Sequence, residues 1–92
     1  MNTVNNLMKV LIVEDESAIR NLISTALETN GYNFEMATNG SRALSLLVKH
    51  QFDIILLDLG LPDLDGIDII KKLRTFSFTP IIVISARSND DD

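Results

Sequence analysis

Three carboxylates stand where two short apolar runs end. Glu14 and Asp15 follow the run at 10–13, and Asp58 follows the run at 54–57. Carboxylates repel one another, and holding their charge beside apolar strands is costly. A chain that gathers three of them there is expected to place a cation between them. The pattern therefore predicts a Mg²⁺ site with one carboxylate left for chemistry.

The chemistry expected of such a site is phosphoryl transfer. Mg²⁺ binds an octahedron of oxygens drawn from one or two carboxylates, water and phosphate. Asp15 and Asp58 can supply carboxylate oxygens and Gly60 a backbone carbonyl, while Glu14 would act through water. A carboxylate oxygen can also attack a phosphoryl group and form an aspartyl phosphate. Asp58 is the candidate nucleophile because its sequence context is the most buried, and Ser85, where the fourth strand ends, can hydrogen-bond a phosphoryl oxygen.

Each of these residues, taken alone, also has a structural interpretation. Asp15 or Glu16 could open a helix and complement its dipole, Asp58 could be an ordinary loop acid, and Ser85 a strand-end hydroxyl. The remaining polar residues of interest are interpreted structurally: Asp63 and Asp65 as turn formers before a permissive Gly66, His50 as a helix C-terminal cap, and Asp90–Asp92 as a solvated tail. The joint pattern is more specific than its parts, because three strand ends agree.

The elements that must position these residues alternate between strand and helix. Apolar, β-branched runs predict strands at 8–13, 34–37, 53–57 and 81–85. Helical periodicity predicts helices from 17 to the Asn30-Gly31 stop, from the Asn39-Gly40 turn to 50, and over 67–74. The first helix carries an apolar stripe made of Ile19, Leu22, Ile23, Ala26 and Leu27.

This alternation predicts an α/β fold, a doubly wound parallel sheet with right-handed crossovers. Ligands of such sheets bind beyond the carboxyl ends of the strands, where the strand order reverses. In a sheet of order 2-1-3-4 that point falls between the first and third strands. Glu14, Asp15 and Asp58 would meet there.

Composition narrows the class of protein. The chain has 92 residues, 46% of them hydrophobic, which suits one small domain with a core. Its net charge of -5 argues against direct contact with nucleic acid. It has no cysteine, no signal-peptide pattern and no apolar run long enough for a membrane. We therefore expect a cytoplasmic protein without membrane contact, whose residues 1–7 form a disordered tail.

Four segments resemble the receiver domain of two-component response regulators. They are Val10–Asp15, Asp53–Asp58, Leu61–Gly66 and Pro80–Ala86. The resemblance covers nearly the whole chain and implies the flavodoxin-like fold. Within the family, the stretches 58–62 and 85–88 most closely resemble the Kdp potassium-responsive regulators of the winged-helix transcription-factor group.

The resemblance implies a role for each residue of the site. Asp58 corresponds to the phospho-acceptor, Glu14 and Asp15 to the acidic pair with Asp15 a direct metal ligand, Gly60 to the position whose carbonyl binds Mg²⁺, and Ser85 to the switch hydroxyl. The implied partner is a sensor histidine kinase, and the implied output in a parent protein is a DNA-binding domain. Such a domain catalyses its own phosphorylation and dephosphorylation only, so it is not expected to be an enzyme in the wider sense.

Compared with the family pattern, residues 8–92 lack a fourth helix, a fifth strand and a fifth helix. No lysine follows Lys72, although the family places one at the end of the fifth strand to contact the phosphoryl group. We therefore expect a C-terminally incomplete receiver of the form (βα)3β in which Mg²⁺ binding persists and phosphorylation is impaired. The fourth strand would form a hydrophobic edge, and such edges pair with other chains. Self-association or segment exchange is predicted in place of an ordinary monomer.

Two other functions would use the same fold. One is a non-phosphorylated interaction module, against which the intact acids at 14, 15 and 58 argue. The other is a phosphohydrolase that forms an aspartyl phosphate. Such enzymes usually carry a second acid two residues after the nucleophile, where this chain has Gly60.

Overall fold

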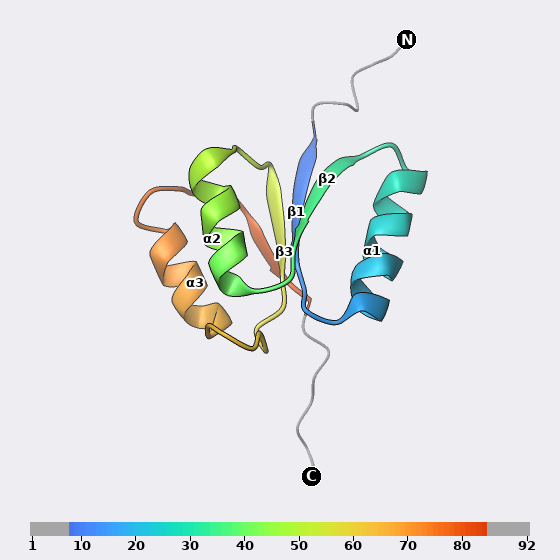
Figure 1. Cartoon of the computed structure of the whole chain (residues 1–92). Coiled ribbons are helices and arrows are strands. Elements are labelled where there is room, and N and C mark those ends of the chain that lie inside the picture. Colours follow the sequence, from blue (N-terminus) through green and yellow to red (C-terminus); the bar gives the residue numbers. More distant parts are fainter. Residues whose placement is uncertain (1–7, 85–92) are drawn as a thin grey trace.

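A computed structural model describes residues 8–84 (Figure 1). The elements follow in the order β1 (Lys9–Val13), α1 (Ser17–Thr29), β2 (Asn33–Ala37), α2 (Gly40–Lys49), β3 (Ile54–Leu57), α3 (Gly66–Leu73) and β4 (Ile81–Val83). Every predicted helix and strand is present, with small shifts at the boundaries. The predicted tails at 1–7 and 90–92 lie outside the described residues. None of the helices within residues 8–84 has the length and apolar character needed to cross a membrane.

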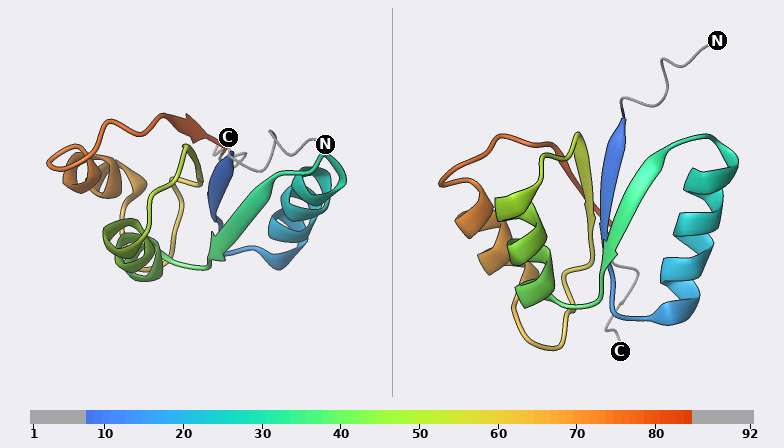
Figure 2. Two further views of the ribbon diagram at one scale, coloured as in Figure 1. Left: turned by 90° about the horizontal axis from the view of Figure 1, so that it is seen from above. Right: turned by 45° about the horizontal axis from the view of Figure 1, so that its top comes forward.

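The four strands form one parallel sheet in the order β2-β1-β3-β4, which confirms the predicted topology. Val10 lies opposite Phe34 on one side and Ile54 on the other, so the ends of three strands are level. α1 lies on one face of the sheet, and α2 and α3 lie on the other (Figure 2). The strand order therefore reverses between β1 and β3, at the point expected to bind ligands in such sheets.

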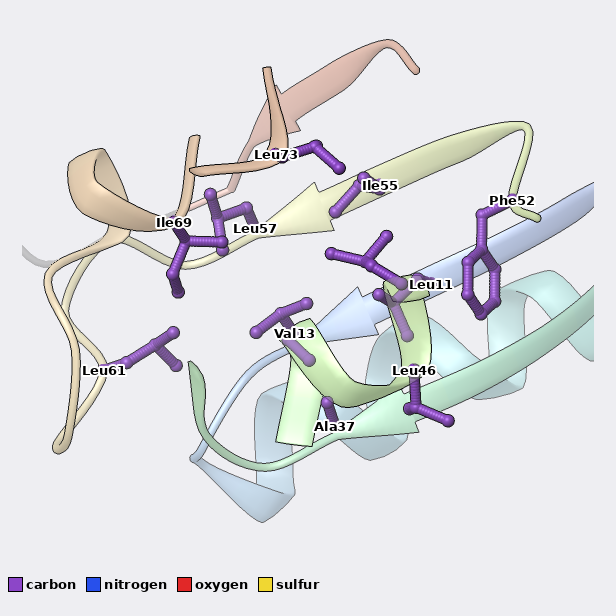
Figure 3. Packing of buried hydrophobic residues seen from close by; sticks show 12 residues of the cluster. Leu11, Val13, Ala37, Leu46, Phe52, Ile55, Leu57, Leu61, Ile69 and Leu73 are labelled. Atoms are coloured by element: carbon purple, nitrogen blue, oxygen red, sulfur yellow. The ribbon is translucent and has the colours of Figure 1, made fainter. Parts of the chain in front are cut away.

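The core fills the space between the sheet and the pair α2 and α3 (Figure 3). Strand side chains alternate between the two faces, and alternate residues of β1 and β3 point toward this pair of helices. The buried cluster consists of Leu11, Val13, Ala37, Ala43, Leu46, Leu47, Phe52, Ile55, Leu57, Leu61, Ile69 and Leu73. Because Val13 and Leu57 are fully buried, this packing fixes the backbone immediately before the predicted acidic site.

α1 packs less closely than its sequence pattern predicts. The helix is present, but none of its residues is buried, and Leu22 of the predicted apolar stripe is 72% exposed. The helix packs mainly against β2 and β1, at one side of the sheet, and this limited contact leaves Leu22 outside the packed surface. Beside α1 lies an apolar groove of about 180 Å³, lined by Met8, Val10, Leu27, Tyr32, Ile54 and Leu56.

β4 forms one edge of the sheet within the described residues. Its predicted length was 81–85, and the observed strand ends at Val83. Ile82 and Val83 are about half exposed, at 49% and 48%. An apolar edge strand of this kind can pair with another chain.

The helix ends test several sequence interpretations. Gly31 adopts a φ of 81°, the left-handed conformation expected after α1. His50 is the C-cap residue of α2, as predicted. Asp65 is the N-cap of α3 and accepts a hydrogen bond from the amide of Ile67. Gly66 was expected to supply a permissive backbone conformation, but its φ is not positive. Glycine is required there for a different reason, because a Cβ would lie 2.7 Å from the Cα of Leu59.

Candidate functional site

The three predicted acids meet at the carboxyl ends of β1 and β3. One carboxylate oxygen from each of Glu14, Asp15 and Asp58 lies within 4.8 Å of the other two. Glu14 and Asp58 are each only 1% exposed, and Asp15 is half-buried. The predicted convergence of these acids is therefore confirmed.

Backbone hydrogen bonds hold the three strand ends together at this site. The amide of Glu14 donates to the carbonyl of Ala37 at 3.0 Å, which joins the ends of β1 and β2. The amide of Asp58 donates to the carbonyl of Val13 at 3.0 Å, which joins β3 to β1. The parallel pairing therefore continues one residue beyond the strands and fixes the backbone of both buried acids.

The electrostatics of the cluster are unfavourable without a cation. Burial raises the pKa of the Glu14 carboxyl above its ordinary value of 4.5, and the nearby charges of Asp58 and Asp15 raise this pKa further. The amide of Glu16 opposes the shift by donating to Oε2 of Glu14 at 3.0 Å. A carboxyl whose ionised form is disfavoured in this way gains from a neighbouring positive charge.

Asp58 is held by the residue two positions later. The amide of Gly60 donates to Oδ1 of Asp58 at 3.0 Å, which fixes the carboxylate relative to the loop. Gly60 itself is exposed at the start of that loop. Ser85, the predicted hydroxyl, lies outside the described residues. The described chain reaches Ile84, whose amide donates to the carbonyl of Leu57 at 2.9 Å.

Arg20 is a residue of this region that the sequence analysis missed. Its Nη1 donates to the carbonyls of Glu14 and Asp15, at 3.1 Å each. The guanidinium thus anchors the backbone of the acidic turn to α1. A basic residue on the helix that follows an acidic pair was the available signal. Glu16 occupies the N-cap of α1, which agrees with the alternative that this acid opens the helix, but its side chain makes no capping hydrogen bond.

Comparison with known proteins identifies the family and the fold. The family model described as the response regulator receiver domain matches residues 10–92. The chain belongs to the response regulator receiver domain family. Members of this family are phospho-acceptors and not enzymes in the usual sense.

This receiver domain is similar to transcriptional regulators of the Kdp group. It is 51% identical over 83 residues to the KDP operon transcriptional regulatory protein KdpE of Escherichia coli. The match covers 90% of this chain and 37% of that relative, so the chain spans little more than a third of its length. The resemblance to Kdp regulators seen in the sequence is thereby confirmed.

Solved structures of receivers share the same fold. The response regulator TrrA of Thermotoga maritima, in complex with Mg²⁺-BeF, is 30% identical with a TM-score of 0.81, and the match covers 88% of this chain and 71% of that one. A chain of the complex between the histidine kinase ThkA and TrrA also matches at 30% identity and a TM-score of 0.81. That match covers 91% of this receiver and 75% of the other chain.

Proposed function

We propose that this receiver accepts a phosphoryl group on Asp58 from a sensor histidine kinase, with Mg²⁺ bound at the same site. The observation that carries the proposal is the convergence of three carboxylates within 4.8 Å, two of them almost fully buried. Acids at a strand end do not gather in this way for solubility, because burial of like charges is costly.

The donor set suits Mg²⁺. Asp15, Asp58 and the carbonyl of Gly60 would be the direct ligands, and Glu14 would act through water. All are oxygen donors, which hard divalent cations prefer, and the remaining positions are left for water and phosphate. The raised pKa of Glu14 supports the same interpretation, because a bound cation would favour its ionised form. The bound ion supplies neutralisation of the charge on the phosphoryl oxygens.

In the proposed reaction a carboxylate oxygen of Asp58 attacks the phosphorus of the phosphohistidine. The P–O bond to Asp58 forms as the N–P bond breaks, and the imidazole nitrogen leaves with the electron pair and takes up a proton. The hydrogen bond from Gly60 holds the Asp58 carboxylate in a fixed orientation, which favours in-line attack. The Ser85 hydroxyl is assigned a hydrogen bond to the phosphoryl group, and this assignment rests on the sequence pattern.

The partners follow from the relatives. The complex of TrrA with the kinase ThkA supports a histidine kinase as donor, and the name of KdpE supports control of transcription in longer proteins of this kind. We propose that a DNA-binding output domain would make the nucleic-acid contacts there and that the receiver itself makes none. A cytoplasmic setting without membrane contact is part of the same proposal.

A phosphorylation experiment tests the assignment of Asp58. The chain is incubated with acetyl phosphate and Mg²⁺, and intact mass is measured. We expect one phosphoryl adduct in the wild type, formed slowly in line with the predicted impairment, none in Asp58→Asn, and an adduct that forms as in the wild type in Asp53→Asn. Asp53 is the matched control, because it lies at the opposite end of β3 and accepts a hydrogen bond from the amide of Lys9 at 2.7 Å.

Each other outcome has a definite meaning. An undiminished adduct in Asp58→Asn would exclude Asp58 as the acceptor. An adduct that forms equally well in chelator would remove the metal from the proposal. Mg²⁺ binding without any adduct would favour an interaction module, and sustained turnover of a phosphomonoester would favour a phosphohydrolase.

A further inference from the structure

The loop between β3 and α3, residues 59–65, reaches across to the start of α2. The carboxylate of Asp63 accepts two hydrogen bonds there, from the amide of Gly40 to Oδ1 at 2.8 Å and from the amide of Ser41 to Oδ2 at 2.9 Å. These amides belong to the first two residues of α2, more than twenty positions earlier in the chain. One side chain thus joins two segments that the sequence keeps far apart.

This contact is not the cap that α2 needs in order to begin. Asn39 already caps the helix, since its side chain accepts a hydrogen bond from the amide of Arg42 at 2.8 Å. Asp65, in the same loop as Asp63, caps its own helix α3 in the ordinary way. Asp63 therefore adds a tertiary link to a helix that has its own cap.

The same loop is held closely at its base and near its tip. At the base, the amide of Gly66 donates to the carbonyl of Leu59 at 3.4 Å, and the two residues are too close for a Cβ on Gly66. Near the tip, a Cβ on Gly40 would lie 2.8 Å from the Cβ of Leu64. Gly60, the proposed carbonyl ligand, lies between these two anchor points.

These links close a ring around the acidic site. The amide of Glu14 joins β1 to the end of β2 at Ala37, and β2 leads directly into the start of α2. Asp63 connects the start of α2 to the loop that begins after Asp58, and the amide of Asp58 returns to β1 at Val13. In this ring the link from α2 to the loop is made by the carboxylate of Asp63.

We propose that Asp63 is a positioning residue of the metal site. Its two hydrogen bonds to α2 hold loop 59–65 so that the carbonyl of Gly60 and the carboxylate of Asp58 serve the same ion. This inference rests on the proposed function, since it assigns Gly60 to the metal. The two amides also hold the pKa of the Asp63 carboxyl below its ordinary value of 3.8, so the tether is ionised at neutral pH.

Loss of the tether should weaken metal binding without abolishing it. The loop would then populate conformations in which Gly60 is displaced, and apparent affinity falls with the fraction that remains competent. We expect Asp63→Ala to weaken Mg²⁺ binding roughly tenfold, the shift that corresponds to one charge-assisted hydrogen bond. Asp63→Asn keeps one acceptor oxygen and should lose less.

The experiment measures Mg²⁺ affinity by NMR titration, read from the amide of Gly60, together with unfolding by urea for each variant. Asp65→Ala is the matched control, because it removes an aspartate cap from the same loop but leaves the link to α2 intact. We expect Asp65→Ala to lose stability comparable to that lost by Asp63→Ala and to keep its Mg²⁺ affinity within about twofold, because the hydrogen bonds from α2 to the loop remain.

Equal losses of Mg²⁺ affinity in Asp63→Ala and Asp65→Ala would overturn the inference and leave Asp63 a structural cap. The same holds if Asp63→Asn and Asp63→Ala both bind like the wild type. A wild-type chain that binds Mg²⁺ but forms no phosphoryl adduct would refute the proposed function and leave the comparison of Asp63 with Asp65 intact. A wild type with no response to Mg²⁺ would overturn both.

Discussion

Replacement of Glu14 by glutamine should stabilise the metal-free receiver at neutral pH. Glutamine retains an oxygen that can accept the hydrogen bond from the amide of Glu16, and its amide group can donate to Asp58. The substitution therefore removes a charge and little else. Since Glu14 is 1% exposed beside two other acids, the removed charge is one that the fold tolerates at a cost.

The expected magnitude follows from the spacing of the acids. Two unit charges no more than 4.8 Å apart repel with at least roughly 3.5 kcal/mol at an effective dielectric constant of about 20. Part of this repulsion is offset in the wild type, because the amide of Glu16 donates a hydrogen bond to the Glu14 carboxylate. We therefore expect a gain in unfolding free energy of about 1–2 kcal/mol for Glu14→Gln in chelator.

The pH dependence has a defined sign. The pKa of Glu14 is higher in the folded state than its ordinary value of 4.5, so the folded state binds this proton more tightly than the unfolded state. As pH falls from neutral toward 4.5, the destabilisation caused by the ionised carboxylate disappears from the wild type. The advantage of Glu14→Gln should therefore be greatest at neutral pH and vanish near the ordinary value.

Urea unfolding followed by circular dichroism is the suitable assay, since the chain has no tryptophan. The assay is run in chelator and in saturating Mg²⁺. Ligand binding stabilises the folded state. The wild type, which keeps all three carboxylates, should therefore gain more stability from Mg²⁺ than the variant does. Glu35→Gln is the matched control. Glu35 forms a partly exposed ion pair with Lys9 at 3.4 Å, and such pairs contribute about 0–1 kcal/mol.

Two results would refute this reasoning. One is a Glu14→Gln variant no more stable than the wild type in chelator at neutral pH. The other is an advantage that persists unchanged at low pH, which would show that the gain is not electrostatic.

Two further predictions concern packing and association. Gly66→Ala should cost about 1–3 kcal/mol of unfolding free energy, the usual cost of overpacking, because its Cβ would lie 2.7 Å from the backbone of Leu59; a variant as stable as the wild type in urea would contradict this. The 92-residue chain should sediment as species larger than a monomer, and Ile82→Lys on β4 should shift it toward monomer. Val48→Lys serves as the control, since Val48 is also exposed but lies on α2; a compact wild-type monomer that unfolds cooperatively would show that this edge does not associate.

The strand ends and the acidic site could be predicted because the signals are local. Short β-branched runs alternate along the sequence with segments of helical periodicity, and few fold topologies are compatible with this alternation. In a parallel sheet, the carboxyl ends of the strands lie at the same edge. Once β1 and β3 are neighbours, Glu14 and Asp58 must meet. The site therefore depends on the strand order more than on the detailed conformation of any loop.

The contacts of Asp63 and Arg20 could not be predicted in the same way. An aspartate in a loop with proline and glycine suits a turn as well as it suits a tertiary link, and nothing near position 63 indicates the amides at 40 and 41. The burial of α1 could not be predicted either. Periodicity indicates that a helix has an apolar face, but it does not indicate how much of that face the sheet covers. Leu22 belongs to the predicted apolar stripe and is nevertheless 72% exposed.

The light packing of α1 has a consequence for how the receiver opens. A helix with no buried residue should separate from the sheet at a lower free energy than global unfolding requires, and its amides should exchange with solvent early. Arg20 would leave with it, and the carbonyls of Glu14 and Asp15 would lose their anchor. Cation binding at the acidic cluster is thus thermodynamically linked to the opening of α1. A bound cation should therefore slow hydrogen exchange of the α1 amides.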